Sequence, residues 1–361
     1  MNHSSELRYA TVGTEDCVKR LFRVIVLGAL GVGLSLLSAA QTQLTSPLPK
    51  LVQSIELPGV KGRIDHMSID VKGKRLFLAA LGNKTVEVID VAAGKTVRAI
   101  TGLKEPQGIL FVPETDLLFV ADGQGNACYI YDGSSYKLIR TEPGLDDADN
   151  IAYDQRSANT YGVGLVDVGY GSGSQAGLRA LDSKSGKPMF EIPVDGHPES
   201  IQLQKTSARI YISVPSAGYI AVADSSRRRV TEKWPVQGFK NIFPMALDEG
   251  DQRLFVGSRT PPALLVFDTK SGKMVANVDG VGDADDLTYD AAHKRLYMTG
   301  GAGMIAVFDQ RDPDHYTLGT KLPSAPGART SLFVPELNRL YVAAPSNTGQ
   351  PARVLVYDLQ P

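Results

Sequence analysis

A short apolar phrase that ends in aspartate occurs seven times along the chain of 361 residues. Lys84–Asp90 (KTVEVID) is the first copy, and Leu264–Asp268 and Arg353–Asp358 are later ones. The final aspartates, which are 42, 50, 42, 44, 41 and 49 residues apart, are Asp90, Asp132, Asp182, Asp224, Asp268, Asp309 and Asp358. This period is typical of a unit of four short strands that buries its apolar faces only by stacking on neighbouring units. We therefore expect one continuous array rather than several independent domains.

A second apolar segment precedes each aspartate phrase and predicts another strand. Its pattern is a basic residue, an aliphatic residue, an aromatic residue and a further apolar residue, as in Arg75–Leu78 and Arg253–Val256. In the third unit we assign this strand to Asn159–Gly162, with Tyr161 as the aromatic residue. That assignment makes the glycine-rich segment Val166–Ala176 the main insertion, between the second and third strands of the unit, where it would face the central channel.

Polar turns follow several of the aspartates and predict hairpins. Asp182-Ser-Lys-Ser-Gly-Lys187 and Asp268-Thr-Lys-Ser-Gly-Lys273 are the clearest examples. An aspartate carboxylate in such a turn accepts hydrogen bonds from turn amides, and the glycine adopts a positive φ. We interpret the seven recurrent aspartates as structural residues and not as catalytic ones.

The two ends of the repeat array complement each other. The seventh copy stops at Pro361, directly after its third strand, while Leu51–Leu57 aligns with the outer strand Lys95–Thr101. The N-terminal strand therefore completes the C-terminal blade and removes the open sheet edges. The predicted fold is an all-β, seven-bladed β-propeller of four-stranded blades, with residues 41–361 as a single domain.

The repeated Arg-Leu-Phe/Tyr-Val strand and the Val-Phe/Ile/Tyr-Asp strand with its Ser-Gly-Lys turn resemble the YncE-like, YVTN-type seven-bladed β-propeller family of exported bacterial proteins. The resemblance covers residues 48–361 and implies the fold and export. It does not imply one activity, because propellers include binding proteins, lactonases and oxidoreductase subunits.

The N-terminal segment has the pattern of a secretory signal peptide. Val24–Leu37 is apolar, and Ser38-Ala39-Ala40 places small residues before Gln41. Basic residues precede the apolar run at Lys19, Arg20 and Arg23. We expect residues 1–40 to be removed and the mature protein to be periplasmic or secreted, without a membrane span. An uncleaved anchor is the alternative, although the run is shorter than the ~20 residues that a span needs.

Residues 1–17 are an unusual lead-in, and Val18 would be a more ordinary start, so we expect a misplaced initiation codon.

The cysteine content limits the chemistry of the mature chain. Cleavage at Gln41 removes Cys17 and leaves Cys128 without an intramolecular partner. Two cysteines also provide no metal-thiolate cage and no haem attachment site.

The charge balance argues against a nucleic-acid partner. The chain has 38 basic and 39 acidic residues, a net charge of -1, so no overall field attracts phosphate backbones. We expect no nucleotide cofactor either, because the glycine run at Gly28, Gly31 and Gly33 belongs to the leader. Neither a GxSxG nor an HExxH motif occurs. We expect a monomer.

Aligning the repeats places one residue of each blade where its innermost strand begins, at the mouth of the central channel. The residues at this level are Asp65, Gln107, Asp149, Glu199, Phe243, Asp285 and Arg329. Adjacent candidates are His66, Asn150, His197 and Asp286. Residues two apart point in similar directions, so Asp147 with Asp149 and Asp283 with Asp285 form acidic pairs. The mouth is therefore acidic although the chain is nearly neutral.

Several interpretations of this ring remain open at the level of sequence. The side chains could only hydrogen-bond the loops, or Asp149, Glu199 and Asp285 could bind Ca²⁺ or another divalent cation. The ring could also bind a small polar molecule, with Arg329 and His66 orienting an acidic group, or catalyse a reaction with His66 or His197 as general base.

The predicted function is that of an exported propeller that binds a small ligand, a metal ion or a partner protein at its acidic mouth. A lactonase-like, metal-dependent hydrolase and an accessory subunit of an exported redox system are the alternatives.

Overall fold

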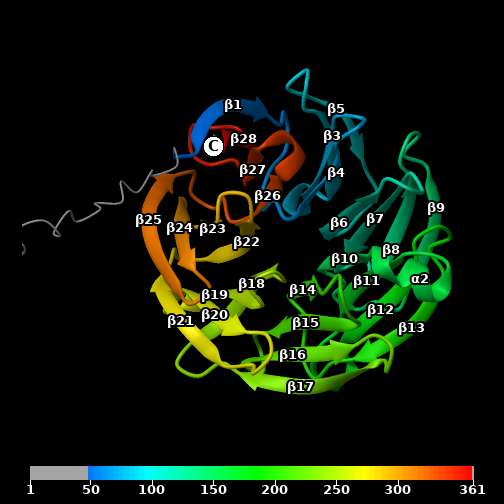
Figure 1. Ribbon diagram of the computed structural model, residues 1–361. Coiled ribbons are helices and arrows are strands. Elements are labelled where there is room, and N and C mark those ends of the chain that lie inside the picture. The colour runs from blue at the N-terminus through cyan, green and yellow to red at the C-terminus, as the bar shows by residue number, and fades with distance from the viewer. Residues whose placement is uncertain (1–47, 360–361) are drawn as a thin grey trace, which may run out of the picture. The chain divides into compact units, whose positions relative to one another are not determined.

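The computed structural model describes residues 48–359, within a compact unit of residues 46–361. These residues form seven four-stranded antiparallel sheets arranged as blades around a centre (Figure 1). The fold is the predicted seven-bladed β-propeller. The leader, with Cys17 and the expected cleavage site, lies outside the described residues. Among residues 48–359 no helix is long and apolar enough to cross a membrane.

Each blade contributes one strand to each of four concentric positions. The innermost strands are β2 (Met67–Asp70), β6 (Pro106–Val112), β10 (Ile151–Asp154), β14 (Ser200–Leu203), β18 (Lys240–Asp248), β22 (Ala284–Asp290) and β26 (Ser331–Val334). The second strands are β3 (Arg75–Ala80), β7 (Leu117–Asp122), β11 (Leu165–Tyr170), β15 (Arg209–Val214), β19 (Arg253–Thr260), β23 (Arg295–Gly300) and β27 (Arg339–Ala344).

The third strands are β4 (Thr85–Asp90), β8 (Ala127–Asp132), β12 (Gly177–Asp182), β16 (Tyr219–Asp224), β20 (Pro262–Asp268), β24 (Met304–Asp312) and β28 (Arg353–Asp358). The outer strands are β5 (Lys95–Ile100), β9 (Leu138–Pro143), β13 (Pro188–Pro193), β17 (Arg229–Pro235), β21 (Met274–Asp279), β25 (His315–Pro323) and β1 (Lys50–Glu56). Short helical turns are η1 (Leu81–Asn83), η2 (Gln155–Ser157), α2 (Ala158–Tyr161), η3 (Gly173–Gln175) and η4 (Pro335–Leu337).

Strand β1 closes the ring as predicted. It pairs antiparallel with β28, from Lys50 opposite Asp358 to Glu56 opposite Arg353, in the sheet order β1-β28-β27-β26. Ile55 at the end of this strand is 1% exposed and joins the core of the seventh and first blades. The closing strand therefore both covers a sheet edge and contributes to the apolar core.

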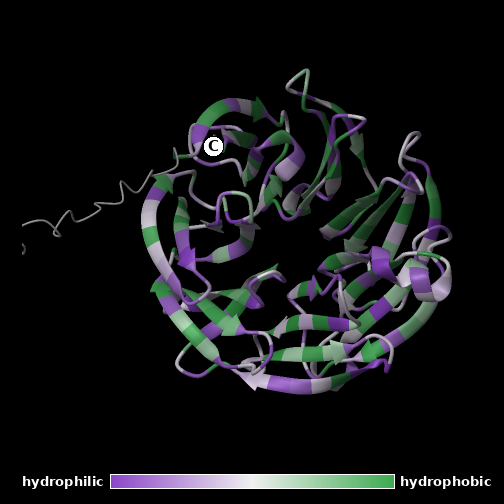
Figure 2. Ribbon diagram, viewed as in Figure 1, coloured by the Kyte–Doolittle hydropathy of each residue, from purple (hydrophilic) through white to green (hydrophobic). Residues whose placement is uncertain are grey.

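The aromatic residues of the second strands pack between neighbouring blades. Phe77, Phe119 and Phe255 are fully buried, and each belongs to a cluster shared with the next blade. Burying such a side chain contributes about 1.5–3 kcal/mol. Figure 2 shows that apolar residues are concentrated in the middle strands of the blades, whereas polar residues are more frequent in the loops and on the outer strands. Alternating side chains therefore hold adjacent blades together.

Five of the seven recurrent aspartates accept hydrogen bonds from turn amides, as predicted, whereas Asp309 and Asp358 pair with Arg295 and Arg339. Oδ1 of Asp182 accepts hydrogen bonds from the backbone N–H groups of Lys184 and Ser185, both at 2.8 Å. Asp268 accepts one from Ser271 at 2.7 Å, and Gly272 in that turn has a φ of 67°. Trp234 also has a structural place, because its ring stacks on Phe267 and is 5% exposed.

The predicted second strand of the third blade is wrong. Residues Asn159 to Tyr161 belong to α2, which ends at Gly162 with a φ of 73°, and the second strand is β11. Asp167 of β11 pairs with Ala152 and occupies the position that an aromatic residue holds in the other blades. Tyr161 imitated the missing aromatic residue in the sequence pattern, six positions too early.

The insertion of the third blade therefore also lies elsewhere. Residues 155–164 connect β10 to β11, at the end of the blade opposite the channel mouth, and they include η2 and α2. Asp154 begins this helical segment, because its side chain accepts a hydrogen bond from the N–H of Ser157. Five of the eleven residues of the predicted insertion, Val166–Tyr170, are regular strand, and residues 171–176 form the connection near the mouth.

Candidate metal centre at the channel mouth

The strand register brings the predicted mouth residues to one level. In each blade, one residue of the innermost strand pairs with the aromatic position of the second strand, as Ser68 does with Phe77 and Gln202 with Tyr211. The predicted mouth residue lies three positions before that residue. Just inside this level is a cavity of about 280 Å³, lined by residues from all seven innermost strands. His66, Asn150, Asp285 and Asp286 are among the residues that line it. The propeller therefore has a polar central cavity that opens where the sequence predicts it.

Asp149, His197 and Glu199 form the tightest group of potential metal ligands among the described residues. One ligand atom from each side chain lies within 4.8 Å of the other two. Nε2 of His197 is 3.7 Å from Oδ2 of Asp149. The geometry therefore places one imidazole nitrogen and two carboxylates around a common point.

Two neighbouring blades hold this group in place. Asp149 lies two residues before the innermost strand β10, and its N–H donates to the carbonyl of Gly169 at 3.0 Å. Glu199 directly precedes β14, with its N–H donating to Ser213 at 3.1 Å. His197 lies on the loop between β13 and β14. Backbone hydrogen bonds therefore fix both carboxylates at the ends of two adjacent strands.

The His197 ring is oriented by a backbone carbonyl. Nδ1 is 2.7 Å from the oxygen of Gly171, and because a carbonyl only accepts, Nδ1 carries the proton. In the neutral ring, Nε2 then carries a lone pair and faces Asp149. This arrangement is typical of metal-binding histidines, whose second nitrogen donates to a carbonyl or carboxylate.

Burial and the neighbouring charges disfavour an ionised Glu199 beside an ionised Asp149. Burial raises the pKa of Glu199 to about 8, and the charge of Asp149 acts in the same direction. Burial lowers the pKa of His197, but the adjacent carboxylates outweigh it and raise that pKa to about 9. Asp149 is only 8% exposed, and its Oδ1 is buried without a hydrogen-bond partner. A cation at this point would satisfy that oxygen and balance the charge.

A second group surrounds His66 on the first and sixth blades. Nδ1 of His66 is 3.6 Å from Asp286, and Nε2 is 3.9 Å from Asp65 and 3.5 Å from the Asn150 amide. Burial raises the pKa of Asp65 to about 6. Burial lowers the pKa of His66, but Asp286 and Asp65 outweigh it and raise that pKa well above its ordinary value. This imidazole therefore lies between two carboxylates that favour its protonated form.

Arginines pair with Asp283 and Asp285 at the mouth. Asp285, predicted as a metal ligand, is paired with Arg259 and lies 3.8 Å from Arg63, outside the group around His197. Arg329 pairs with Asp283 at 2.8 Å. The repeat alignment does not identify Arg63 and Arg259 as mouth residues, because neither lies at the start of an innermost strand.

Gln107, the remaining predicted mouth residue, donates from its side chain to the carbonyl of Ala148 at 3.3 Å. This contact joins the second blade to the third beside Asp149. The structure thus places Gln107 in support of the loop and outside the ligand group.

Comparisons with known proteins show the fold and nothing finer. No protein-family model matches the chain, and no curated protein matches its sequence. A chain in the structure described as "Crystal Structure of Mitotic Checkpoint Complex" is similar to it with a TM-score of 0.71 and 13% identity, over 88% of this chain and 98% of that one. A chain of the hydrazine synthase of Kuenenia stuttgartiensis is similar with a TM-score of 0.69 and 14% identity, over 83% and 98%.

Proposed function

We propose that this protein binds a divalent transition-metal ion at the channel mouth and uses the ion to hold a small ligand. The observation that carries the proposal is the convergence of Asp149, His197 and Glu199 within 4.8 Å, with a buried carboxylate oxygen of Asp149 left unpaired. General binding of ligands or partners is a common use of the propeller fold.

The donor set favours zinc or manganese over calcium. Calcium takes six to eight oxygen ligands, whereas an imidazole with two carboxylates suits Zn²⁺ or Mn²⁺. Three protein ligands also leave at least one coordination position for water or for a ligand atom. The adjacent cavity of about 280 Å³ gives room for a small molecule beside that position.

The leader supports a place of action outside the cytoplasm. An apolar run, basic residues before it and small residues before Gln41 are the features of an exported chain. Together with the resemblance to the YncE-like family, they favour a periplasmic or secreted binding protein.

Metal binding can be measured on the purified protein by elemental analysis and calorimetry. We expect one equivalent of Zn²⁺ or Mn²⁺ to bind, and we expect Asp149→Asn or Glu199→Gln to weaken it at least tenfold, since each removes a ligand charge. Asp147→Asn is the matched control. Its side chain is 58% exposed, and although its Oδ2 lies 3.6 Å from Nδ1 of His197, it is not one of the three ligand side chains.

The control also defines the contrary result. Equal loss of metal in Asp147→Asn and in Asp149→Asn would show a diffuse acidic surface and not a metal centre. Absence of any bound metal in the unaltered protein would refute the proposal outright.

A further inference from the structure

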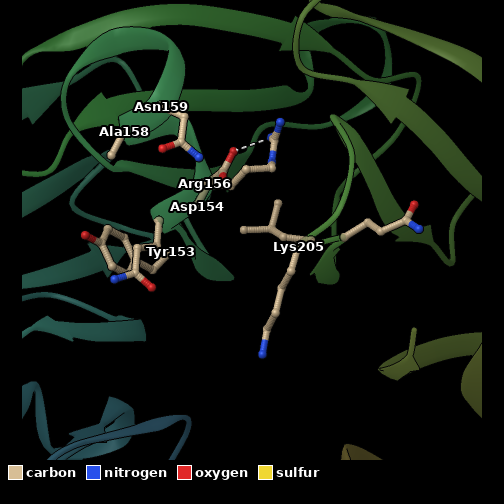
Figure 3. A pocket seen from close by; sticks show the side chains of 9 residues that line it. Tyr153, Asp154, Arg156, Ala158, Asn159 and Lys205 are labelled. Carbon is tan, nitrogen blue, oxygen red and sulfur yellow. Dashed lines mark hydrogen bonds and ion pairs between the residues drawn. The ribbon is translucent and has the colours of Figure 1, made fainter. Parts of the chain in front are cut away.

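A larger cavity lies at the opposite ends of the two strands that carry the metal group. It has a volume of about 590 Å³ and is lined by the last residues of β10, by the insertion of the third blade and by the residues after β14. Figure 3 shows Tyr153 and Asn159 to the left of Lys205 and Arg156 above it, with the Lys205 side chain extending away from Arg156 into the open space. The volume is within the range of small-molecule sites.

Two features of the third blade open its boundary with the fourth blade. The insertion of residues 155–164 builds one wall, and Asp167 replaces the aromatic side chain that fills the equivalent place at other boundaries. By strand alternation Asp167 points the same way as Leu165, which packs in the cluster shared with the fourth blade. A smaller, polar side chain therefore lies where Phe77 or Tyr211 packs elsewhere.

The acidic group of the cavity is already satisfied. Asp154 accepts hydrogen bonds from the N–H and Oγ of Ser157 at 3.1 and 2.5 Å, and from Arg156 at 2.7 Å. Arg156 also donates to Ser225 of the fourth blade at 3.1 Å. The carboxylate therefore offers little to a ligand, and its charge is neutralised by the guanidinium.

The unused hydrogen-bonding groups of the lining are mainly donors. Nε of Arg156 is buried without a partner, and the Lys205 ammonium has no partner among the described residues. The Gln204 side-chain oxygen accepts from Ser207 at 2.9 Å, which leaves its amide N–H groups free. Asn159 adds a further amide. With Arg156 and Asp154 cancelling, Lys205 gives the lining a net charge of +1.

We propose that this cavity binds a small organic anion, a carboxylate or a phosphate ester, through Lys205 and the surrounding amides. Charge-assisted hydrogen bonds from an ammonium to such a group are stronger than neutral ones. The Tyr153 ring and Leu203 supply apolar surface for the carbon skeleton of the ligand. The site is separate from the metal centre, at the far end of the same two strands.

The proposal can be tested by titrating the full-length protein with gluconate, with glucose 6-phosphate and with uncharged glucose in a calorimeter. We expect at least one of the two anions to bind and glucose not to bind. Binding of gluconate alone identifies a carboxylate site, and binding of glucose 6-phosphate alone identifies a phosphate site. Lys205→Met and Asn159→Asp should each weaken binding about tenfold, since one removes a positive charge and the other adds a negative one.

Two control variants locate the binding. Lys187→Met removes an exposed lysine from the third blade outside the cavity, and Glu199→Gln alters the metal group; both should leave anion binding unchanged. Failure of both anions to bind, or binding that Lys205→Met leaves unchanged, would overturn the proposal. Loss of binding in Glu199→Gln would assign the anion to the channel mouth instead.

Discussion

His197 and Glu199, the ligand candidates beside Asp149, are two titratable residues in a place where burial opposes the charge of each. The pKa of Glu199 is raised to about 8 and that of His197 to about 9, so both side chains hold a proton at neutral pH. A metal ion binds only the deprotonated carboxylate and the neutral imidazole. Metal binding at this mouth must therefore release protons.

The affinity for metal should consequently rise with pH. Between pH 6 and pH 7 the pH is below the pKa of both Glu199 and His197, so we expect the apparent association constant for Mn²⁺ to rise by roughly tenfold to a hundredfold per pH unit. Calorimetry in buffers of different ionisation enthalpy would count the protons released. Glu199→Gln should reduce the slope by about one proton, and a slope of zero in the unaltered protein would contradict the pKa directions.

At the scale of the element, the third blade separates what the sequence predicts from what it does not. The start of β10 was placed correctly, because the positions of Asp149 and Asn150 follow from the repeat spacing. The second strand was displaced to Tyr161, because the pattern requires an aromatic residue and β11 has Asp167 there. The alternation of Val166 and Val168 with smaller or polar residues was the signal for the true strand.

The sequence predicts which residues lie at the channel mouth, but it does not predict which of their side chains contact one another. Strand spacing alone places Asp65, Asp149, Glu199 and Asp285 at one level. Which of them meets His197 and which meets an arginine depends on loop conformation, as with Arg259 reaching Asp285. Such contacts between blades have no periodicity in sequence, and so the sequence placed Asp285 in the metal group instead of His197.

The buried carboxyl group of Asp167 in β11 should make the stability of the protein depend on pH. It is 2% exposed, and burial, with the nearby Asp154 acting in the same direction, raises its pKa to about 7. Between about pH 4 and pH 7 the unfolded chain ionises this carboxyl while the folded chain keeps it protonated, so stability falls with rising pH and levels off above about 7. Asp167→Asn removes this dependence, because an amide does not titrate.

Urea unfolding of the two proteins measures the effect. At pH 4 we expect Asp167→Asn and the unaltered protein to have similar free energies of unfolding. At pH 8 we expect the variant to be more stable by about 2–4 kcal/mol. A difference that does not change between the two pH values would show that the carboxyl titrates normally. Asp195→Asn, at an exposed loop aspartate that lies 3.3 Å from Lys233, is the control and should show no such change.

At the scale of the molecule, the proposed metal site and the proposed anion site lie at opposite ends of one pair of strands. β10 and β14 begin at the metal group and end at the cavity with Lys205. Both strands can stay rigid only while the ring is closed, since each blade is supported by its two neighbours. The stability of the closure is therefore a condition for both proposed sites.

The closure itself can be tested by deleting residues 48–58, which include β1. The deletion leaves the edge of β28 unpaired and removes the buried side chains Ile55 and Leu57, each 1% exposed. We expect the melting temperature to fall by on the order of ten degrees, and we expect the protein to self-associate on gel filtration through the new edge. Leu51→Ser, at a position 50% exposed on the same strand, should change neither property. An unchanged melting temperature after the deletion would mean that β1 contributes nothing to closing the ring.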